Sequence, residues 1–224
     1  MTLIDYPSKV AAIIFTVGCN FRCRFCHNAK LVLPDLFNRD ELIDEQDILA
    51  FLKTRIGKLE AVVITGGEPT LQIDLKIFIK KVKNMGFLVK LDTNGTNPDM
   101  IKNLLDDKLI DYIAMDVKID LEPGCYQRIV DNNVDIEDIK QSIDLIMNSN
   151  IDYEFRTTVA PGITKENIKN IVEYIKGSKK YYLQEFQDGD VLDNTCKKDK
   201  WLTRDELDVI ANEIKHNFND CQAR

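Results

Sequence analysis

Three cysteines lie close together near the start of the chain, in the string VGCNFRCRFCHN that follows an apolar run. Cys19, Cys23 and Cys26 have the spacing Cys-x3-Cys-x2-Cys, which places three soft thiolates on one tight loop with no fourth cysteine nearby. A closed structural zinc site takes four ligands, and an ordinary iron–sulfur cluster takes four cysteines. Three thiolates instead suit a [4Fe–4S] cluster with one iron open to a substrate. The spacing therefore indicates redox chemistry, with a partial zinc knuckle or three unrelated thiols as alternatives.

A glycine-rich string, TGGEPT, follows a later apolar run. Gly66 and Gly67 allow the backbone a close approach to a ligand or a positive φ, and Pro69 stiffens the turn. The carboxylate of Glu68, with nearby backbone carbonyls, suits an ammonium group. An ordinary turn from strand to helix is the alternative.

Polar strings follow two further apolar runs, DTNG from Asp92 to Gly95 and MDVK from Met115 to Lys118. Ligands bind at the carboxyl ends of the strands of a parallel sheet, so we expect these strings at one edge of it. The alternative for DTNG is a plain turn, which Asp, Asn and Gly favour in any loop.

An aromatic residue, Phe25, precedes the last of the three cysteines, and the string resembles the signature of the radical S-adenosylmethionine (radical SAM) superfamily. The resemblance implies that the cysteines hold a [4Fe–4S] cluster, whose fourth iron is chelated by the methionine amino and carboxylate groups of the cosubstrate. It also implies that Gly66, Gly67 and Glu68 hold the methionine amino group.

The strings DTNG and DVK resemble motifs of the glycyl-radical enzyme activases within that superfamily. The resemblance assigns Asp92, Thr93 and Asp116 to a monovalent cation beside the cosubstrate. It places Asn94 near the ribose or the methionine, and Lys118 against the methionine carboxylate or the substrate peptide.

Two candidate residues belong to the strand-like run YEFRTTVAPG. A buried arginine needs partners, so Arg156 is expected either to pair with a carboxylate of the protein or to meet a carboxylate of the ligand or peptide. Val159 is expected to pack on the adenine of the cosubstrate, with ordinary core packing as the alternative.

The resemblance implies an enzyme that cleaves S-adenosylmethionine reductively and uses the resulting 5′-deoxyadenosyl radical to form a glycyl radical on a partner enzyme. The expected partner is anaerobic ribonucleotide reductase, and the expected electron donor is flavodoxin or ferredoxin. Three alternatives stay open. They are an activase of the pyruvate formate-lyase type, a small-molecule radical SAM enzyme such as 7-carboxy-7-deazaguanine synthase, and a non-catalytic zinc-binding module.

Apolar runs alternate with segments of helical periodicity along the whole chain, which predicts a parallel α/β sheet. We expect six strands at 11–17, 61–65, 87–91, 112–115, 153–159 and 181–186. The expected helices span 45–54, 71–84, 99–106, 136–148, 167–175 and 204–218. Six units are too few for a closed eight-stranded barrel, so we expect a partial, open (β/α)6 barrel of the radical SAM type. We interpret 1–224 as a single domain, with a cluster loop at 18–28 and a C-terminal surface loop and helix at 187–224.

The composition limits the classes of partner. The 224 residues carry a formal net charge of −7, which argues against nucleic-acid binding, since that usually needs a basic face. No apolar run has the length of a membrane span, and the first residues do not resemble a signal peptide. We therefore expect a cytoplasmic protein, a compartment in which cysteines bind metals or act in catalysis more often than they form disulfides. Cys125, Cys196 and Cys221 lack mutual ligand spacing and are interpreted as free thiols.

Overall fold

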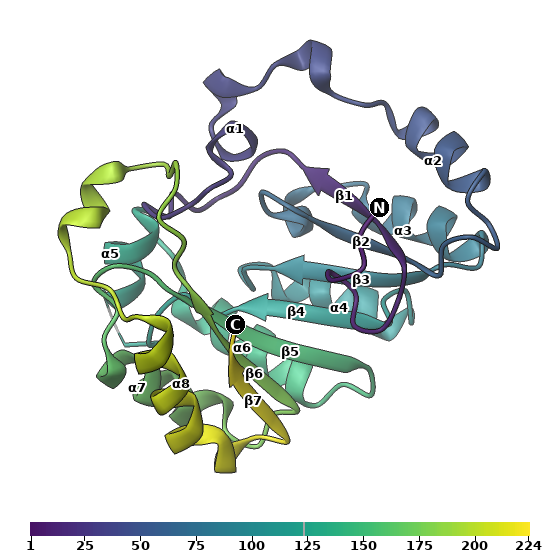
Figure 1. Cartoon of the computed structure of the whole chain (residues 1–224). Helices are drawn as coiled ribbons and strands as arrows, with labels where there is room; N and C mark the ends of the chain where they lie inside the picture. The colour runs from purple at the N-terminus through teal and green to yellow at the C-terminus, as the bar shows by residue number, and fades with distance from the viewer. Residues whose placement is uncertain (123) are drawn as a thin grey trace.

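Seven parallel strands form one curved sheet in which spatial order follows chain order, from β1 to β7 (Figure 1). The computed structural model describes residues 1–122 and 124–224. The strands are β1 (Ala11–Thr16), β2 (Ala61–Gly66), β3 (Leu88–Thr93), β4 (Tyr112–Asp116), β5 (Asp152–Val159), β6 (Lys180–Glu185) and β7 (Asp220–Ala223). Within the described residues β1 and β7 do not pair, so the barrel is open, as predicted.

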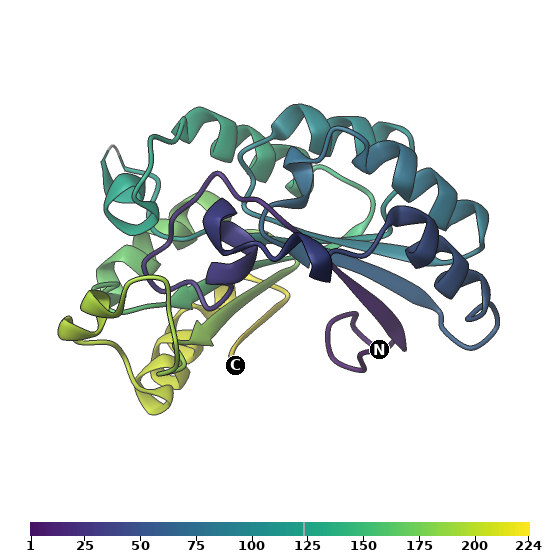
Figure 2. The same ribbon diagram turned by 90° about the horizontal axis from the view of Figure 1, so that it is seen from above.

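Helices connect successive strands and cover one face of the sheet (Figure 2). They are α1 (Ala29–Val32), α2 (Glu45–Lys53), α3 (Leu75–Asn84), α4 (Pro98–Asp106), α5 (Cys125–Val130), α6 (Ile136–Met147), α7 (Lys165–Ile175) and α8 (Arg204–Ile214). Short 3₁₀ turns occur at Pro34–Leu36, Arg39–Glu41, Pro69–Leu71, Asn194–Lys198 and Lys215–Asn217. No helix among the described residues is long and apolar enough to cross a membrane.

The two faces of the sheet differ in chemistry because side chains alternate along each strand. Residues such as Ile64, Leu91 and Phe155 face the helices and join the large apolar core. The opposite, concave face carries a small apolar cluster around Ala61, Val63 and Tyr112. On β3 to β6, the strand residues whose side chains point to this concave face are mostly charged or aromatic. The concave face is therefore the one on which polar chemistry is built.

The predicted elements are present, with several corrected boundaries. All six expected strands occur, with ends within two residues of those predicted. The third strand extends to Thr93, so part of the DTNG string is strand rather than loop. The helix expected from Leu71 begins at Leu75, because Glu68 first caps a 3₁₀ turn at Pro69–Leu71. The last helix ends at Ile214 instead of continuing to 218.

Three elements were missing from the prediction, namely β7 and the short helices α1 and α5. The β7 sequence, DCQA, has only four residues and no β-branched or aromatic side chain, and its strand form comes from pairing with β6. The structure therefore has seven strands rather than six, while the open parallel barrel itself is confirmed.

Candidate active site

The three cysteines lie on the loop that follows β1, at the carboxyl edge of the sheet. A turn brings the second and third together, since the Cys26 N–H donates to the Cys23 carbonyl over 2.9 Å. Cys23 is buried, with 8% of its surface exposed, while Cys19 and Cys26 are partly exposed. The thiol sulfur of Cys19 accepts the N–H of Phe21 over 3.3 Å, which fixes its direction.

The electrostatics of this loop disfavour free thiolates and favour a positively charged partner. Burial raises the pKa of Cys23 to about 12, Lys118 opposes that shift, and the thiols of Cys26 and Cys19 add to it. Burial also raises the pKa of Cys19. A coordinating metal removes this penalty, because a bound thiol is deprotonated outright.

The donor set fits an iron–sulfur cluster with three protein ligands. Among the described residues, no three His, Cys, Asp or Glu side chains gather around one point as the ligands of a single ion do. Thiolates of a [4Fe–4S] cluster sit on separate irons, so they are spaced more widely. His27, next to Cys26, is engaged elsewhere: its Nδ1 lies 3.0 Å from the Asp190 carbonyl, and its ring stacks on Phe186.

The two glycines of TGGEPT bring the end of β2 against the cysteine loop. Gly66 has φ +116°, and a Cβ there would lie 2.5 Å from the backbone N and O of Thr16. A Cβ on Gly67 would overlap the carbonyl group of Gly18. This contact permits two backbone hydrogen bonds, from Gly67 N–H to the Thr16 carbonyl (2.9 Å) and from Glu68 N–H to the Gly18 carbonyl (2.8 Å). The backbone at these two glycines therefore lies close to the cysteine loop of the same chain, whereas the sequence suggested a close approach to a ligand.

The carboxylate of Glu68 is buried and joins two strand ends. Its Oε1 accepts the hydroxyl groups of Thr70 (2.5 Å) and Thr93 (2.7 Å) and the Thr70 N–H (3.1 Å). Its Oε2 accepts the Asn94 N–H over 2.7 Å. Burial raises the pKa of Glu68 in spite of these donors. Both oxygens are thus used to hold the DTNG turn beside the TGGEPT turn.

Asn20, a residue that sequence reasoning did not single out, links the cysteine loop to the DTNG turn. The Asn94 side-chain amide donates to the Asn20 Oδ1 over 2.9 Å, and the Asn20 amide donates to Thr96 over 2.8 Å. The Thr96 hydroxyl in turn donates to the Asn94 Oδ1 over 2.7 Å. Its place between the first two cysteines was the only sequence signal for Asn20. Three loops from separate strands are therefore locked together at one edge of the sheet.

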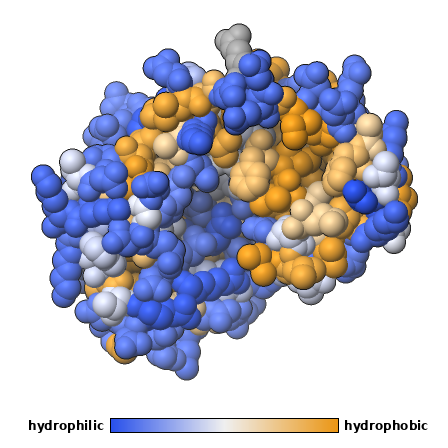
Figure 3. Space-filling view, turned by 45° about the horizontal axis from the view of Figure 1, so that its top comes forward, coloured by the Kyte–Doolittle hydropathy of each residue, from blue (hydrophilic) through white to orange (hydrophobic). Residues whose placement is uncertain are grey.

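Five charged side chains form an alternating row across β3, β4 and β5. Arg156 lies between two carboxylates, with Nε 2.8 Å from an Asp116 oxygen and Nη1 3.3 Å from an Asp92 oxygen. Lys90 pairs with Asp92 over 2.7 Å, and Lys118 with Asp116 over 2.9 Å. Arg156 Nη1 also lies 3.9 Å from an oxygen of the buried Glu154, so three cations face three carboxylates here. A space-filling view shows a hollow lined by hydrophilic residues in the middle of the molecule (Figure 3).

This row shifts the ionisation of its members. Burial by itself would raise the pKa of Asp116, but Arg156 and Lys118 hold that pKa well below its usual range. Burial would lower the pKa of Lys118, but Asp116 and the Cys23 thiolate keep it above its usual value. Lys118 therefore places a permanent positive charge between Asp116 and the cysteine loop.

The remaining predicted site residues are buried on the helix side. Val159 is completely buried in the helix-side core, and its contact with adenine stays a prediction. Phe25 is 7% exposed and packs in the same core. Thr93 is 3% exposed and turns its hydroxyl toward Glu68, away from Asp92 and Asp116.

The stretch 187–200, expected to be a surface loop, is mostly exposed and is also tied to the cysteine loop. The Leu192 N–H donates to the Cys26 carbonyl and the Asp193 N–H to the Arg24 carbonyl, each over 2.9 Å. The Arg24 guanidinium pairs with the Asp193 carboxylate over 2.9 Å. Cys196 in this stretch is 3% exposed. The stretch therefore supports one side of the cysteine loop.

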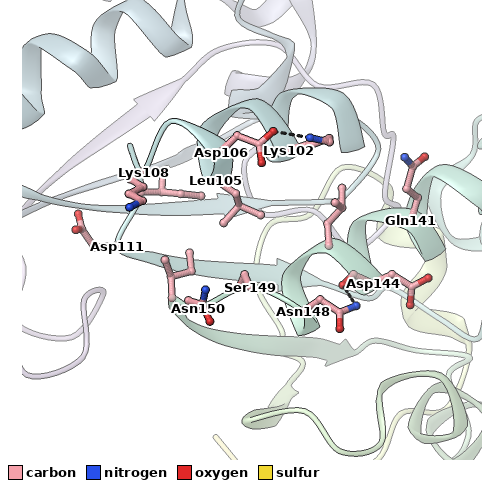
Figure 4. Close-up of a pocket in the computed structure, with 13 residues that line it drawn as sticks. Lys102, Leu105, Asp106, Lys108, Asp111, Gln141, Asp144, Asn148, Ser149 and Asn150 are labelled. Carbon is pink, nitrogen blue, oxygen red and sulfur yellow. Dashed lines mark hydrogen bonds and ion pairs between the residues drawn. The ribbon is translucent and has the colours of Figure 1, made fainter.

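A separate groove of about 690 Å³ lies between the ends of α4 and α6 (Figure 4). Its lining includes Lys102, Asp106, Gln141 and Asp144. Asp111, which immediately precedes β4, also lines it, so the groove is at the amino end of that strand. It shares no residue with the cysteine loop.

The fold and the site define an α/β enzyme with an open parallel barrel, three thiols at the carboxyl edge of the sheet and a charged row beneath them. The radical SAM superfamily model matches residues 13–175, and the chain belongs to that superfamily. The family implies a [4Fe–4S] cluster and S-adenosylmethionine, which agrees with the donor set of the loop. Because the chain belongs to this superfamily, it is an enzyme and not a non-catalytic zinc-binding module.

Relatives extend over nearly the whole chain. A protein of Methanocaldococcus jannaschii named "Putative glycyl-radical enzyme activating enzyme" is 39% identical over 232 residues, covering 100% of this chain and 92% of its own. A GTP 3′,8-cyclase of Aliarcobacter butzleri is 26% identical over 209 residues, covering 91% of this chain and 62% of its own.

Among solved structures, Streptococcus suis SuiB bound to S-adenosylmethionine matches with a TM-score of 0.73 at 14% identity. The match covers 96% of this chain, which spans only 50% of the SuiB chain. At this identity the match shows the fold alone.

Proposed function

We propose that this chain is a radical SAM activase that generates a glycyl radical on a partner enzyme, with anaerobic ribonucleotide reductase as that partner. The observation that carries the proposal is the 39% identity to the M. jannaschii protein over the full length of this chain. When bound, the cluster and cosubstrate supply one-electron cleavage of S-adenosylmethionine to methionine and a 5′-deoxyadenosyl radical, which takes a hydrogen from the target glycine. Flavodoxin or ferredoxin is the proposed electron donor, and the cytosol, where thiols stay reduced, is the proposed compartment.

In this proposal the chain positions reactants and excludes water. Cys19, Cys23 and Cys26 hold the cluster. The backbone of Gly66 and Gly67 contacts the methionine end of the cosubstrate. Both oxygens of Glu68 already accept hydrogen bonds within the chain, so we assign Glu68 to holding the two turns in register, with its negative charge facing the ammonium group.

Lys118 and Arg156 offer the positive charge that a carboxylate needs. Lys118 follows β4 at the carboxyl edge of the sheet, the edge that also carries the cysteine loop, and we propose that it meets the methionine carboxylate there. Asn94 is proposed to face the ribose or methionine at the same edge, where Asn20 orients its amide.

The monovalent cation implied by the resemblance does not fit the residues as they lie. The guanidinium of Arg156 already bridges Asp92 and Asp116, and the hydroxyl of Thr93 is directed to Glu68. A further cation would lie at close range to Lys90, Arg156 and Lys118, whose charges already balance the carboxylates there, with little solvent screening. We therefore assign the bridging positive charge to Arg156.

The test is an anaerobic reaction of the reconstituted, reduced protein with S-adenosylmethionine and the anaerobic ribonucleotide reductase of the same organism. A glycyl-radical doublet in the electron paramagnetic resonance spectrum, with a matching yield of 5′-deoxyadenosine, is the expected result. Deoxyadenosine without a protein radical would assign the chain to another glycyl-radical enzyme or to a small-molecule substrate. Absence of both products would refute the proposed chemistry.

Two cysteine variants provide a matched control. Cys23→Ala is expected to lose the iron and all deoxyadenosine formation while keeping the circular dichroism spectrum of the parent. Cys221→Ala, on β7 and away from the loop, is expected to keep both iron and activity. Equal iron content in the two variants would contradict the assignment of the cluster ligands.

A further inference from the structure

The first strand is an edge of the open sheet, and its two rows of backbone groups have different partners. The Thr16 carbonyl accepts the Gly67 N–H on the β2 side, so the even-numbered residues of β1 point their backbone groups toward β2. The odd-numbered residues point theirs outward. At the start of β1, Ala11 uses this outer side to exchange two hydrogen bonds with Thr2, of 2.8 and 3.0 Å.

The outer side is unpaired in the middle of the strand. In the part of the chain that the structure describes, no hydrogen bond reaches the backbone N–H or C=O of Ile13 or Phe15. Beyond them, the Val17 carbonyl accepts the side-chain amide of Gln72 over 2.8 Å. The N–H and C=O groups of Ile13 and Phe15, four groups between the hydrogen-bonded Ala11 and Val17, are therefore available to another strand.

An apolar groove of about 750 Å³ runs along this edge, between β1 and the segment that carries α2. Its walls include Phe15, Leu42, Ile43 and Phe51, whose exposed fractions are 52%, 50%, 69% and 42%. Figure 3 shows hydrophobic residues gathered on the side of the molecule where Figure 1 places β1 and α2. An apolar patch beside unpaired backbone is what a groove for an added strand requires.

The described side chains that line the groove carry charge of one sign only. The lining includes four acids and, among its described residues, no lysine or arginine; the acids are Glu41, Glu45, Asp47 and Asp74. Glu45 is paired with Lys81, so three of the four have no such ion-pair partner among the described residues. A second copy of this chain at the same edge would bring like charges together, whereas a basic segment would meet opposite charge.

We propose that the outer edge of β1 binds an extended segment of a partner protein as an added strand, and that lysine or arginine flanks the apolar stretch of that segment. The added backbone pairs with Ile13 and Phe15. Alternate side chains of the segment pack on the apolar walls, while its flanking charges meet Glu41 and Asp47. A small apolar ligand or a lipid chain has no backbone with which to pair those four groups.

The proposal is tested with the full-length chain and two fluorescent, end-blocked peptides. Both have an alternating Val-Thr centre, and two lysines or two glutamates flank it at each end. The lysine peptide is expected to bind at least tenfold more tightly by fluorescence anisotropy, with affinity falling as salt is raised. It should also slow hydrogen exchange of the amides in residues 13–15, measured by mass spectrometry. Equal affinities, or binding without that protection, would overturn the proposal.

Three variants locate the binding. Ile13→Pro removes an outward N–H, which an edge strand tolerates, together with a partly buried apolar side chain, and should abolish binding. Glu41→Lys, a surface change, should weaken the lysine peptide and strengthen the glutamate peptide. Ile73→Ser, at a residue that is 96% exposed and outside the groove, should change neither. Unchanged peptide binding to Ile13→Pro and Glu41→Lys would refute the site. If the protein self-associates and Ile13→Pro abolishes that self-association, the edge of β1 binds a second copy of this chain instead.

Discussion

At the scale of single residues, Arg156 has the most distinctive position in the site. It was expected to meet a carboxylate of either the protein or the ligand, and it lies between two carboxylates of the protein. Its guanidinium has several donors in a fixed plane, so it can bridge Asp92 and Asp116 and still face a third group. In the proposed site, Arg156 takes the place that the resemblance gave to a monovalent cation.

Replacing this guanidinium should make the stability of the protein depend on a metal cation bound in its place. In Arg156→Gln, the carboxylates of Asp92 and Asp116 lose their bridging charge, and we expect about 3 kcal/mol of lost stability, typical of a broken buried pair. Potassium chloride should restore part of that loss, while choline chloride at equal ionic strength should not. Urea unfolding in the two salts measures this. Arg24→Gln, at an arginine on the surface, is the control and should show no difference between the salts.

The low pKa of Asp116 predicts a particular pH dependence of stability. A carboxyl whose folded-state pKa lies below its unfolded value stabilises the protein fully above the unfolded value of about 3.9, and this stabilisation is lost as pH falls through the lower, folded-state pKa. The unfolding free energies of the wild type and Asp116→Asn should therefore differ by a constant amount from pH 7 to about pH 5 and converge below about pH 4. Glu68, whose pKa is raised by burial, contributes equally to both proteins and cancels in the comparison. A difference that changes between pH 7 and pH 5 would contradict the assignment.

At the scale of elements, the paired glycines hold two loops in contact. The TGGEPT string was interpreted as allowing close approach to a ligand, and the structure shows that the first close approach is to the backbone of the cysteine loop. The position of the proposed cluster relative to the end of β2 therefore depends on a contact that only glycine permits.

Gly67→Ala should separate these two loops. The added methyl group overlaps the Gly18 carbonyl, and we expect a destabilisation of about 1–3 kcal/mol together with weaker binding of S-adenosylmethionine. Thermal unfolding and isothermal titration measure the two effects. Gly189→Ala is the matched control, because the nearest atom to its Cβ would be 3.7 Å away, on His27. Wild-type affinity in Gly67→Ala would contradict the role of this contact.

At the scale of the whole molecule, the C-terminal part of the chain returns to the cysteine loop near its start. The stretch 187–200 bonds to the backbone of Arg24 and Cys26, although more than 160 residues separate them. This contact shields one side of the loop. The cysteine loop is therefore supported by the stretch 187–200, in which the sequence showed no motif.

Loosening that contact should expose the proposed cluster to oxygen. Asp193→Ala removes the partner of Arg24 and the cap on the Asn194–Lys198 turn, and we expect iron to be lost in air about two to five times faster. The decay of cluster absorbance after exposure to air measures this rate. Asp188→Ala, which removes an exposed partner of Lys197, should decay at the parent rate. Equal rates for both variants would show that the stretch does not shield the loop.

The sequence by itself determined the parallel open barrel, the cysteine loop and the polar strings at the strand ends, because hydrophobic periodicity and short motifs are local properties. It could not reveal β7, whose strand form depends on β6, or the role of Asn20, whose side-chain partners lie in the loop after β3. It also left open whether Arg156 pairs within the chain and whether Val159 is buried. Only the tertiary structure decided these points, since burial and pairing depend on which distant segments the fold brings together.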